Sequence, residues 1–168
     1  MDNHAQNLID ECKRQEESCL FTSTALFEWL KFLRCWKIFF VVAPIILAAV
    51  ATGLPASLKP RLEWLTSACA LLAGIAVAVY KALDLDVSLD GVAKYANQYK
   101  VLQDRFRQAW RVSAHGAFDD FKKEFDKLMG RMDTLRSSSP PPPERFFNKA
   151  QAKIRAGHYD FGTDLKQP

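Results

Sequence analysis

The stretch that decides the fold is Ile38-Phe-Phe-Val-Val-Ala-Pro-Ile-Ile-Leu-Ala-Ala-Val-Ala-Thr-Gly-Leu54, which lies inside a longer run without charge. Between Lys37 and Lys59 no Asp, Glu, Lys or Arg occurs, which leaves 21 uncharged residues. A helix of that length reaches roughly 31 Å, about the thickness of the hydrocarbon core of a bilayer. We therefore expect a membrane-spanning helix over about residues 38–57.

A second uncharged run of 17 residues follows, from Trp64 to Tyr80. It reaches about 26 Å as a helix, near the lower limit for a span, and the methylene chain of Lys81 extends it. Both end residues are aromatic, and aromatic residues favour the membrane interface. We expect a second span over about residues 62–81 and a transmembrane hairpin over residues 38–80.

The average composition of the whole chain is that of an ordinary soluble protein and gives no sign of this hairpin. The 168 residues carry 23 Lys+Arg and 19 Asp+Glu, a net charge of +4, and 49% are hydrophobic. Nearly all of this charge lies in the two flanks. The composition and this uneven distribution of charge together exclude a disordered chain, a disulfide scaffold and a small soluble globule with one mixed core. Two buried helices of a soluble bundle would keep a polar stripe, which neither run has. A cleaved signal peptide is not expected, since 37 residues with a polar helical pattern precede the first run.

The topology follows from loop length and charge. The short loop between the runs places both termini on the same side of the membrane. The flanks carry 21 of the 23 basic residues, and Lys59 and Arg61 lie in the loop. By the positive-inside rule we expect a multi-pass membrane protein with both termini in the cytoplasm.

Residues 1–37 are expected to form an N-terminal cytoplasmic helix. Apolar residues recur there at helical spacings, and the acidic first half argues against a surface helix that binds lipid. Packing on protein is the better interpretation. The apolar positions are Leu8, Ile9, Cys12, Cys19, Leu26, Trp29, Leu30 and Leu33.

After the second span, Asp84–Asp90 is expected to be a short turn with capping residues, and residues 84–136 to form a long or broken cytoplasmic helix. Its apolar seam has a 3.5-residue period and slips at His115-Gly116. Two interpretations stay open, a bundle with the N-terminal helix and a coiled coil between subunits. The seam residues are Val92, Tyr95, Tyr99, Leu102, Phe106, Phe118, Phe121, Phe125 and Leu128.

The Ser/Pro segment 137–143 predicts an extended linker, and residues 144–168 predict a short basic helix and tail. The basic residues of that helix, Arg145, Lys149, Lys153 and Arg155, are expected to form a solvated face. Direct nucleic-acid binding is not expected.

Within the spans, small residues align on one face. Ala70, Gly74 and Ala78 recur every fourth residue, as do Ala48 and Thr52 in the first span, and Pro44 can kink that span. Such a face lets a neighbouring helix approach closely, so we expect oligomers. A single hairpin cannot enclose a pore, and an aqueous path would need several copies.

We expect no enzymatic activity, cofactor or metal site. The four cysteines at 12, 19, 35 and 69 form no Cys-x-x-Cys pair, and reduced, packed thiols are the expected state. The histidines His4, His115 and His158 lack a partnered nucleophile, and Asp119-Asp120 is expected to be a solvated face.

The chain resembles the SLATT family, two-transmembrane effector domains associated with bacterial nucleotide-signalling conflict systems. The resemblance rests on Tyr95-Ala-Asn-Gln-Tyr-Lys-Val-Leu102, on Pro143, and on Lys149-Ala-Gln-Ala-Lys-Ile-Arg-Ala-Gly-His-Tyr159. It implies a pore-forming effector of antiphage defence that oligomerises and permeabilises the inner membrane, causing abortive infection or growth arrest. It also implies activation by a partner sensor, a nucleotidyltransferase or its nucleotide product, and it supplies no catalytic residues. The alternative is a membrane-anchored adaptor whose cytoplasmic helices bind a partner.

Overall fold

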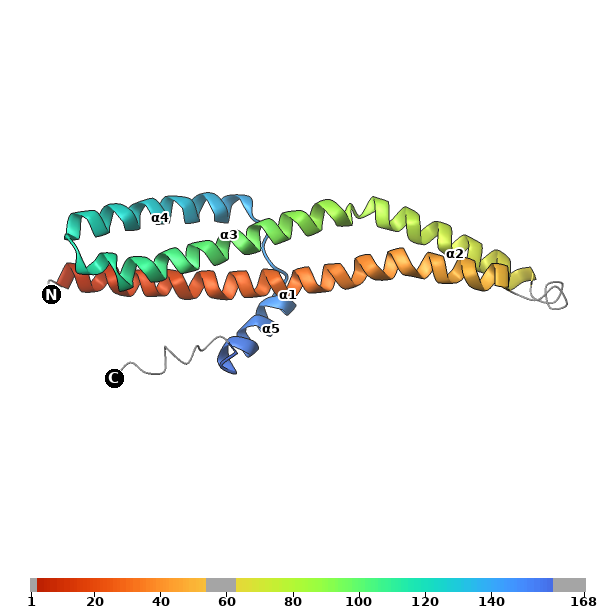
Figure 1. Cartoon of the computed structure of the whole chain (residues 1–168), viewed down its shortest axis with the longest axis horizontal. Helices are drawn as coiled ribbons and strands as arrows, with labels where there is room; N and C mark the ends of the chain where they lie inside the picture. Colours follow the sequence, from red (N-terminus) through yellow and green to blue (C-terminus); the bar gives the residue numbers. More distant parts are fainter. Residues whose placement is uncertain (1–2, 54–62, 159–168) are drawn as a thin grey trace. The chain divides into compact units, whose positions relative to one another are not determined.

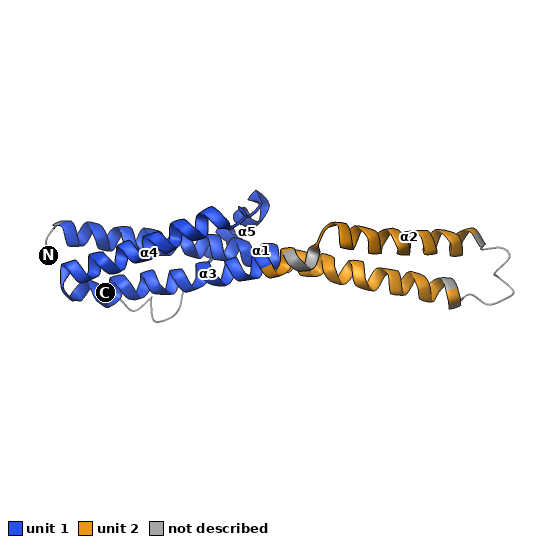
Figure 2. Cartoon of the chain, turned by 90° about the horizontal axis from the view of Figure 1, so that it is seen from above, with its two compact units in different colours: residues 1–30, 91–168 blue, residues 31–90 orange. Residues whose placement is uncertain are grey.

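A computed structural model describes residues 3–53 and 63–158 of the chain, and within these ranges it contains helices and turns without a strand. The expected all-α fold is confirmed. The chain divides into two compact units, one of residues 1–30 and 91–168 and one of residues 31–90 (Figure 2). The helices are α1 (Asn3–Gly53), α2 (Glu63–Ala82), α3 (Leu85–Arg111), the short 3₁₀ helix η2 (Ser113–His115), α4 (Phe118–Ser138) and α5 (Glu144–Arg155).

The first unit is a bundle in which the first part of α1 lies beside α3 and α4 (Figure 1). Its core forms because each helix carries apolar residues at spacings of three and four, which bury one face of each helix. Polar residues occupy the outer faces. The buried core residues include Ile9, Cys12, Cys19, Leu26, Leu30, Val92, Tyr99, Leu102, Phe106, Phe121, Leu128, Met132 and Leu135.

The break between α3 and α4 falls where the seam was predicted to slip. Backbone bonds from His115 N to Val112 O (3.2 Å) and from Gly116 N to Ser113 O (3.0 Å) form a tight turn. Ala117 is extended (ψ 134°) and its carbonyl accepts the bond from Phe121 N, which begins α4. The predicted region is therefore a broken helix, and α4 runs back alongside α3 (Figures 1 and 2).

The second unit is the hairpin, formed by the part of α1 after Leu30 together with α2 (Figure 2). The two helices lie side by side (Figures 1 and 2), and Cys69 of α2 is buried at 6% exposure. Helix α1 continues through Pro44 to Gly53, and α2 occupies nearly the whole predicted second span. Residues 54–57 and 62 of the predicted spans lie outside the described residues.

The predicted turn over Asp84–Asp90 is wrong in extent, because α3 already begins at Leu85. Asp84 alone adopts a left-handed conformation (φ 43°), which aspartate tolerates better than most residues. Its carbonyl accepts a bond from Ser88 N at 3.0 Å, the first bond of the new helix. One residue with positive φ therefore separates the two helices, and no longer turn is needed.

The predicted linker begins later than residue 137. Helix α4 continues to Ser138 because the hydroxyls of Ser137 and Ser138 each donate a bond of 2.9 Å to Thr134 O. Ser139 (φ −82°, ψ 138°) and Pro143 (φ −56°, ψ 142°) are extended, close to polyproline geometry.

Helix α5 ends in a glycine cap. Gly157 has φ 76° and donates to Ile154 O, while His158 N donates to Lys153 O, the two bonds of a Schellman motif. The short basic helix is thus present, and the predicted tail beyond His158 lies outside the described residues.

Candidate functional site: the apolar hairpin and the bundle with its docked terminal helix

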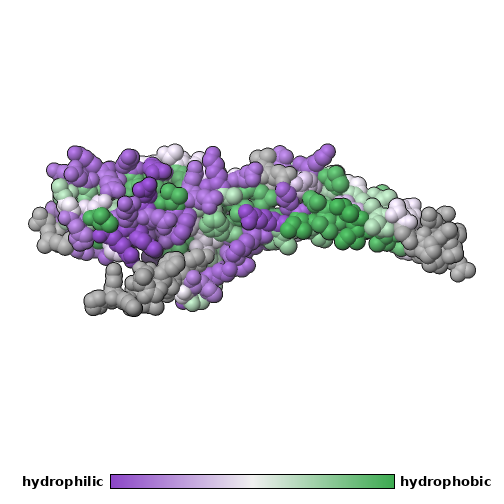
Figure 3. All heavy atoms as spheres, viewed as in Figure 1, coloured by the Kyte–Doolittle hydropathy of each residue, from purple (hydrophilic) through white to green (hydrophobic). Residues whose placement is uncertain are grey.

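The outer surface of the hairpin is apolar on both helices. Ile38 (63% exposed), Ile45 (64%), Leu71 (64%) and Ile75 (50%) are among its large exposed side chains. Hydrophobic residues form a patch on the face of this region that Figure 3 shows. An apolar patch of this extent is foreign to the surface of a soluble monomer. By length and composition, α1 and α2 each contain a candidate membrane span. In the apolar 18-residue stretch of each helix, 0% of the residues are buried in α1 and 6% in α2.

The predicted small-residue face is exposed and not packed within the hairpin. Ala70, Gly74 and Ala78 are exposed in α2, as are Ala48 and Thr52 in α1. A Cβ atom built on Gly74 meets nothing within 4 Å. The hairpin instead packs through other residues, Cys69 among them. The small residues therefore leave a face that no helix of the described chain covers.

The hydroxyl of Thr52, the polar member of that face, donates within its own helix, to Ala48 O (3.0 Å) and Ala49 O (3.3 Å). This satisfies its donor without a partner from another helix. Pro44 lies inside α1, and the helix continues on both sides of it.

The seam residues of α3 and α4 belong to the core of a single chain. Val92, Tyr99, Leu102, Phe106, Phe121 and Leu128 are buried, and Tyr95 and Phe125 are half-buried. The rings of Phe106 and Phe125 meet edge to face with centroids 6.4 Å apart. Of the two interpretations left open by the sequence, the structure shows the bundle with the N-terminal helix.

Phe118 departs from the predicted seam. It is 42% exposed, because it is the first residue of α4 and no preceding helical turn brings it over the core. The seam of α4 therefore begins at Phe121.

Two sets of polar contacts between the helices of the bundle could not be predicted from the spacing of residues along the sequence. Glu16 accepts bonds from Arg107 Nε and from Trp110 Nε1, each at 2.6 Å, which ties α1 to α3. Arg136 donates to Gln15 Oε1 at 3.1 Å and ties α1 to α4. Charge-assisted bonds of this kind fix the register of helices that apolar packing alone would leave free to slide.

The basic face of α5 is not simply solvated, which corrects the prediction for Lys149 and Lys153. Glu28 of α1 is 2% exposed, and its Oε2 lies 2.9 Å from Lys149 Nζ and its Oε1 2.7 Å from Lys153 Nζ. The two lysines are one helical turn apart on α5, so both reach the same carboxylate. A buried carboxylate needs such partners, because removing it from water without compensation is expensive.

Apolar contacts complete the docking of α5. Phe146 and Ala150 are buried, and the ring of Phe147 lies 6.2 Å from that of Phe21 of α1, centroid to centroid. The predicted short basic helix is thus a part of the bundle, held by one charged cluster and one aromatic contact.

The cysteines of the bundle are inert thiols. Cys12 and Cys19 are fully buried, and Cys19 Sγ lies 3.6 Å from the sulfur of Met132. Burial is the main cause that raises the pKa of both thiols to about 12, with Glu11 adding to the effect at Cys12. Cys69 is also buried, whereas Cys35 is exposed, so the expectation of packed thiols is wrong for Cys35.

This difference predicts the pattern of thiol labelling. At pH 8 the thiolate fraction of Cys12 and Cys19 is on the order of 10⁻⁴, and no reagent reaches the buried sulfur. We expect maleimide to label Cys35 within minutes in the chain purified in detergent, and Cys12 and Cys19 only after denaturation. A Cys35→Ser variant is the control and should lose the fast-reacting site. Fast modification of Cys12 or Cys19 in the native chain would contradict this packing.

The histidines and the Asp119-Asp120 pair, the other residues that could take part in chemistry, do not come together in one site. His4, His115 and His158 are exposed on different segments, and Asp120 pairs with Lys123 at 3.9 Å on the surface of α4. Among residues 3–53 and 63–158, no three His, Cys, Asp or Glu side chains converge in a way that could hold a metal ion.

No family model matches the chain, and no curated protein or solved structure is similar to it.

Proposed function

We propose that this chain is a non-enzymatic membrane effector of bacterial antiphage defence. Activated by a partner or signal, it disrupts the inner membrane and causes abortive infection or growth arrest. Both termini lie in the cytoplasm, and no cofactor takes part. The two candidate spans and the resemblance of Tyr95–Leu102 and Lys149–Tyr159 to SLATT effectors support this proposal.

The observation that carries the proposal is the exposed apolar surface of the hairpin. Its candidate span windows are 0% and 6% buried, so residues 3–53 and 63–158 offer nothing that shields them from water. Lipid is the solvent that matches such a surface, because each helix satisfies its own backbone bonds. The bundle, in contrast, has a buried core and a polar exterior suited to the cytoplasm.

Disruption of the membrane requires several copies of the hairpin. The exposed face of Ala70, Gly74 and Ala78 allows the backbone of a neighbouring span to approach closely. An assembly of such hairpins has a weakly polar or hydrophobic lining, so wetting and dewetting would control conduction.

The test is the membrane potential of bacteria that express the chain, alone, with its neighbouring genes, and under phage challenge. We expect rapid depolarisation and dye uptake only in the presence of a neighbour or phage. An intact potential in every condition, with the chain confirmed in the membrane fraction, would overturn the effector function and favour the membrane-anchored adaptor.

Gly74→Ile distinguishes these two functions. A bulky side chain on the small-residue face should cost about 1–2 kcal/mol per helix contact and lower depolarisation about tenfold or more, while insertion is unchanged. Leu72→Phe adds bulk on the opposite side of α2, where Leu72 is 52% exposed, and serves as the control. Depolarisation by Gly74→Ile at the level of the unmodified chain would contradict assembly through this face.

A further inference from the structure

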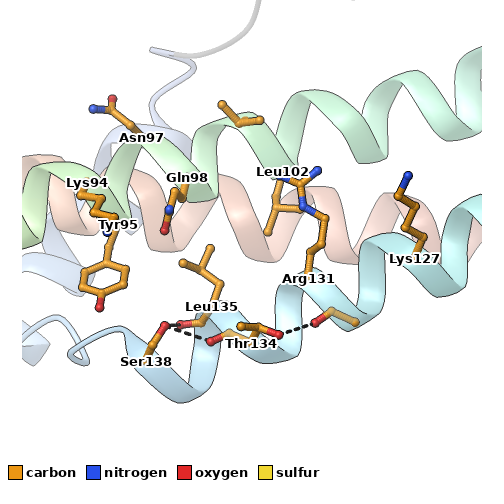
Figure 4. A pocket seen from close by; sticks show the side chains of 12 residues that line it. Lys94, Tyr95, Asn97, Gln98, Leu102, Lys127, Arg131, Thr134, Leu135 and Ser138 are labelled. Carbon is orange, nitrogen blue, oxygen red and sulfur yellow. Dashed lines mark hydrogen bonds between the residues drawn. The ribbon is translucent and has the colours of Figure 1, made fainter.

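A groove of about 860 Å³ lies between α3 and α4, on the bundle surface (Figure 4). Its walls come from Lys94 to Leu102 of α3 and from Lys127 to Ser138 of α4. A volume of this size accommodates a whole small molecule, since ligand sites typically measure about 300–1,000 Å³.

Three cationic side chains line the groove and no carboxylate does. Lys94 comes from α3, and Lys127 and Arg131 come from α4, one turn apart (Figure 4). Among the described residues, none of the three forms an ion pair or a hydrogen bond, whereas Arg107 and Arg136 of the same bundle are both bonded to α1. Lys94 and Lys127 lie at opposite ends of the groove, and Arg131 lies next to Lys127 (Figure 4). An anion near Lys127 and Arg131 would relieve the repulsion between these two neighbouring charges.

Neutral donors accompany the cations. The side chains of Tyr95, Asn97 and Gln98 also line the groove and form no hydrogen bond with the described part of the chain. Their hydroxyl and amide groups can donate to a ligand. The hydroxyls of Thr134 and Ser138 instead donate to carbonyls of α4 and can only accept.

Gly130 lies in the wall of the groove. It lies in the interior of α4, where glycine costs about 1 kcal/mol relative to alanine. A Cβ atom built there meets nothing within 4 Å, so close packing does not require the glycine.

The groove also has an apolar part. Val101 is 48% exposed within it, and the buried Leu102 and Leu135 form its floor beside the ring of Tyr95. A purely inorganic anion would leave this surface unused, whereas an organic anion would cover it.

We propose that the groove between α3 and α4 binds a small organic phosphate. Lys127 and Arg131 hold the phosphate groups, and the remainder of the ligand lies along the groove toward Tyr95 and Lys94. Arginine suits phosphate because its planar guanidinium donates two parallel bonds, and lysine adds point charges. This inference does not rest on membrane disruption, since it concerns only the bundle.

The test is direct binding to the full-length chain purified in neutral detergent. The probes are adenosine diphosphate, inorganic pyrophosphate and micelle-dispersed phosphatidylglycerol, measured by equilibrium dialysis or titration calorimetry. We expect adenosine diphosphate to bind more tightly than pyrophosphate, because it also covers the apolar part. Tighter binding of phosphatidylglycerol, weakened by the same substitutions, would support the site with a lipid headgroup as the source of the phosphate.

Three variants locate the binding. Arg131→Gln and Lys127→Gln should each weaken it about 10–100-fold, as expected for a charge-assisted bond. Gly130→Trp should weaken it at least about tenfold by filling the groove. Lys122→Gln removes an exposed charge of α4 outside the groove and should leave affinity unchanged.

The integrity of each variant is checked by its helical content and by the protection of Cys12 and Cys19 from maleimide. Binding that persists unchanged in Arg131→Gln and Gly130→Trp, or no binding of any of the three probes, would overturn the proposal. Either result would leave the test of membrane potential unaffected.

Discussion

Substitution of Phe106 by alanine is expected to lower the free energy of unfolding of the bundle by about 3–5 kcal/mol, a large fraction of the stability of a domain of this size. Phe106 is 0% exposed in α3, and its ring meets Phe125 of α4 edge to face. The alanine variant loses the transfer free energy of the ring and leaves a cavity that the three helices cannot close fully. Denaturation of the chain in detergent, followed by circular dichroism and by exposure of Cys12 and Cys19, measures the loss.

Phe118→Ala is the matched control, because it removes the same ring from a position that is 42% exposed. Its expected effect is below about 1 kcal/mol, as for most surface substitutions. Phe106→Leu keeps most of the volume and should destabilise by only about 1–1.5 kcal/mol. Equal losses for Phe106→Ala and Phe118→Ala would show that Phe106 is not a core residue.

The second large effect is expected from removing both lysines that pair with Glu28. In a Lys149→Ala/Lys153→Ala variant the carboxylate, 2% exposed, loses both ion pairs while it stays buried. Removing the partners of a buried charge typically costs about 3–5 kcal/mol. Undocking of α5 avoids that cost by returning Glu28 to water, so we expect α5 to separate from the bundle while the core remains folded.

Hydrogen exchange of the α5 amides and chymotrypsin cleavage at Phe146 and Phe147 measure this separation. Both should increase about a hundredfold, the equivalent of roughly 2.7 kcal/mol. A Lys122→Ala/Arg155→Ala variant removes the same charge from exposed positions and should leave protection unchanged.

A rescue distinguishes the buried charge from simple loss of lysine packing. Adding Glu28→Leu to the double lysine variant removes the carboxylate and fills its place with an apolar side chain, which is often neutral or stabilising. We expect protection of α5 to return in this triple variant. Continued exposure of α5 would mean that the lysines hold it by contacts other than their ion pairs.

Some parts of the fold could be predicted because their cause is local. The two uncharged runs mark the hairpin whatever the rest of the chain does, since the preference of a helix for lipid depends on its own side chains. The slip of the seam at His115-Gly116 marked the place where a long helix could break, and α3 and α4 are separated there. The proline run predicted the extended segment before α5. The capping residues after α2 predicted a turn over Asp84–Asp90, which is too long. The single residue Asp84, with its positive φ, completes the turn.

The sequence by itself therefore determined the helices, the charge-free hairpin and the apolar faces that must be buried. Only the tertiary structure decided what covers those faces. The seam residues of α3 and α4 pack within one chain, and Phe118 lies outside that seam. Lys153 contacts Glu28, which is 125 residues away in the sequence. The groove likewise exists only because α4 returns beside α3. The reason is that periodicity specifies which face of a helix is apolar but not how helices are rotated against each other. That rotation depends on the turn geometry and on the fit of side chains that are distant in sequence.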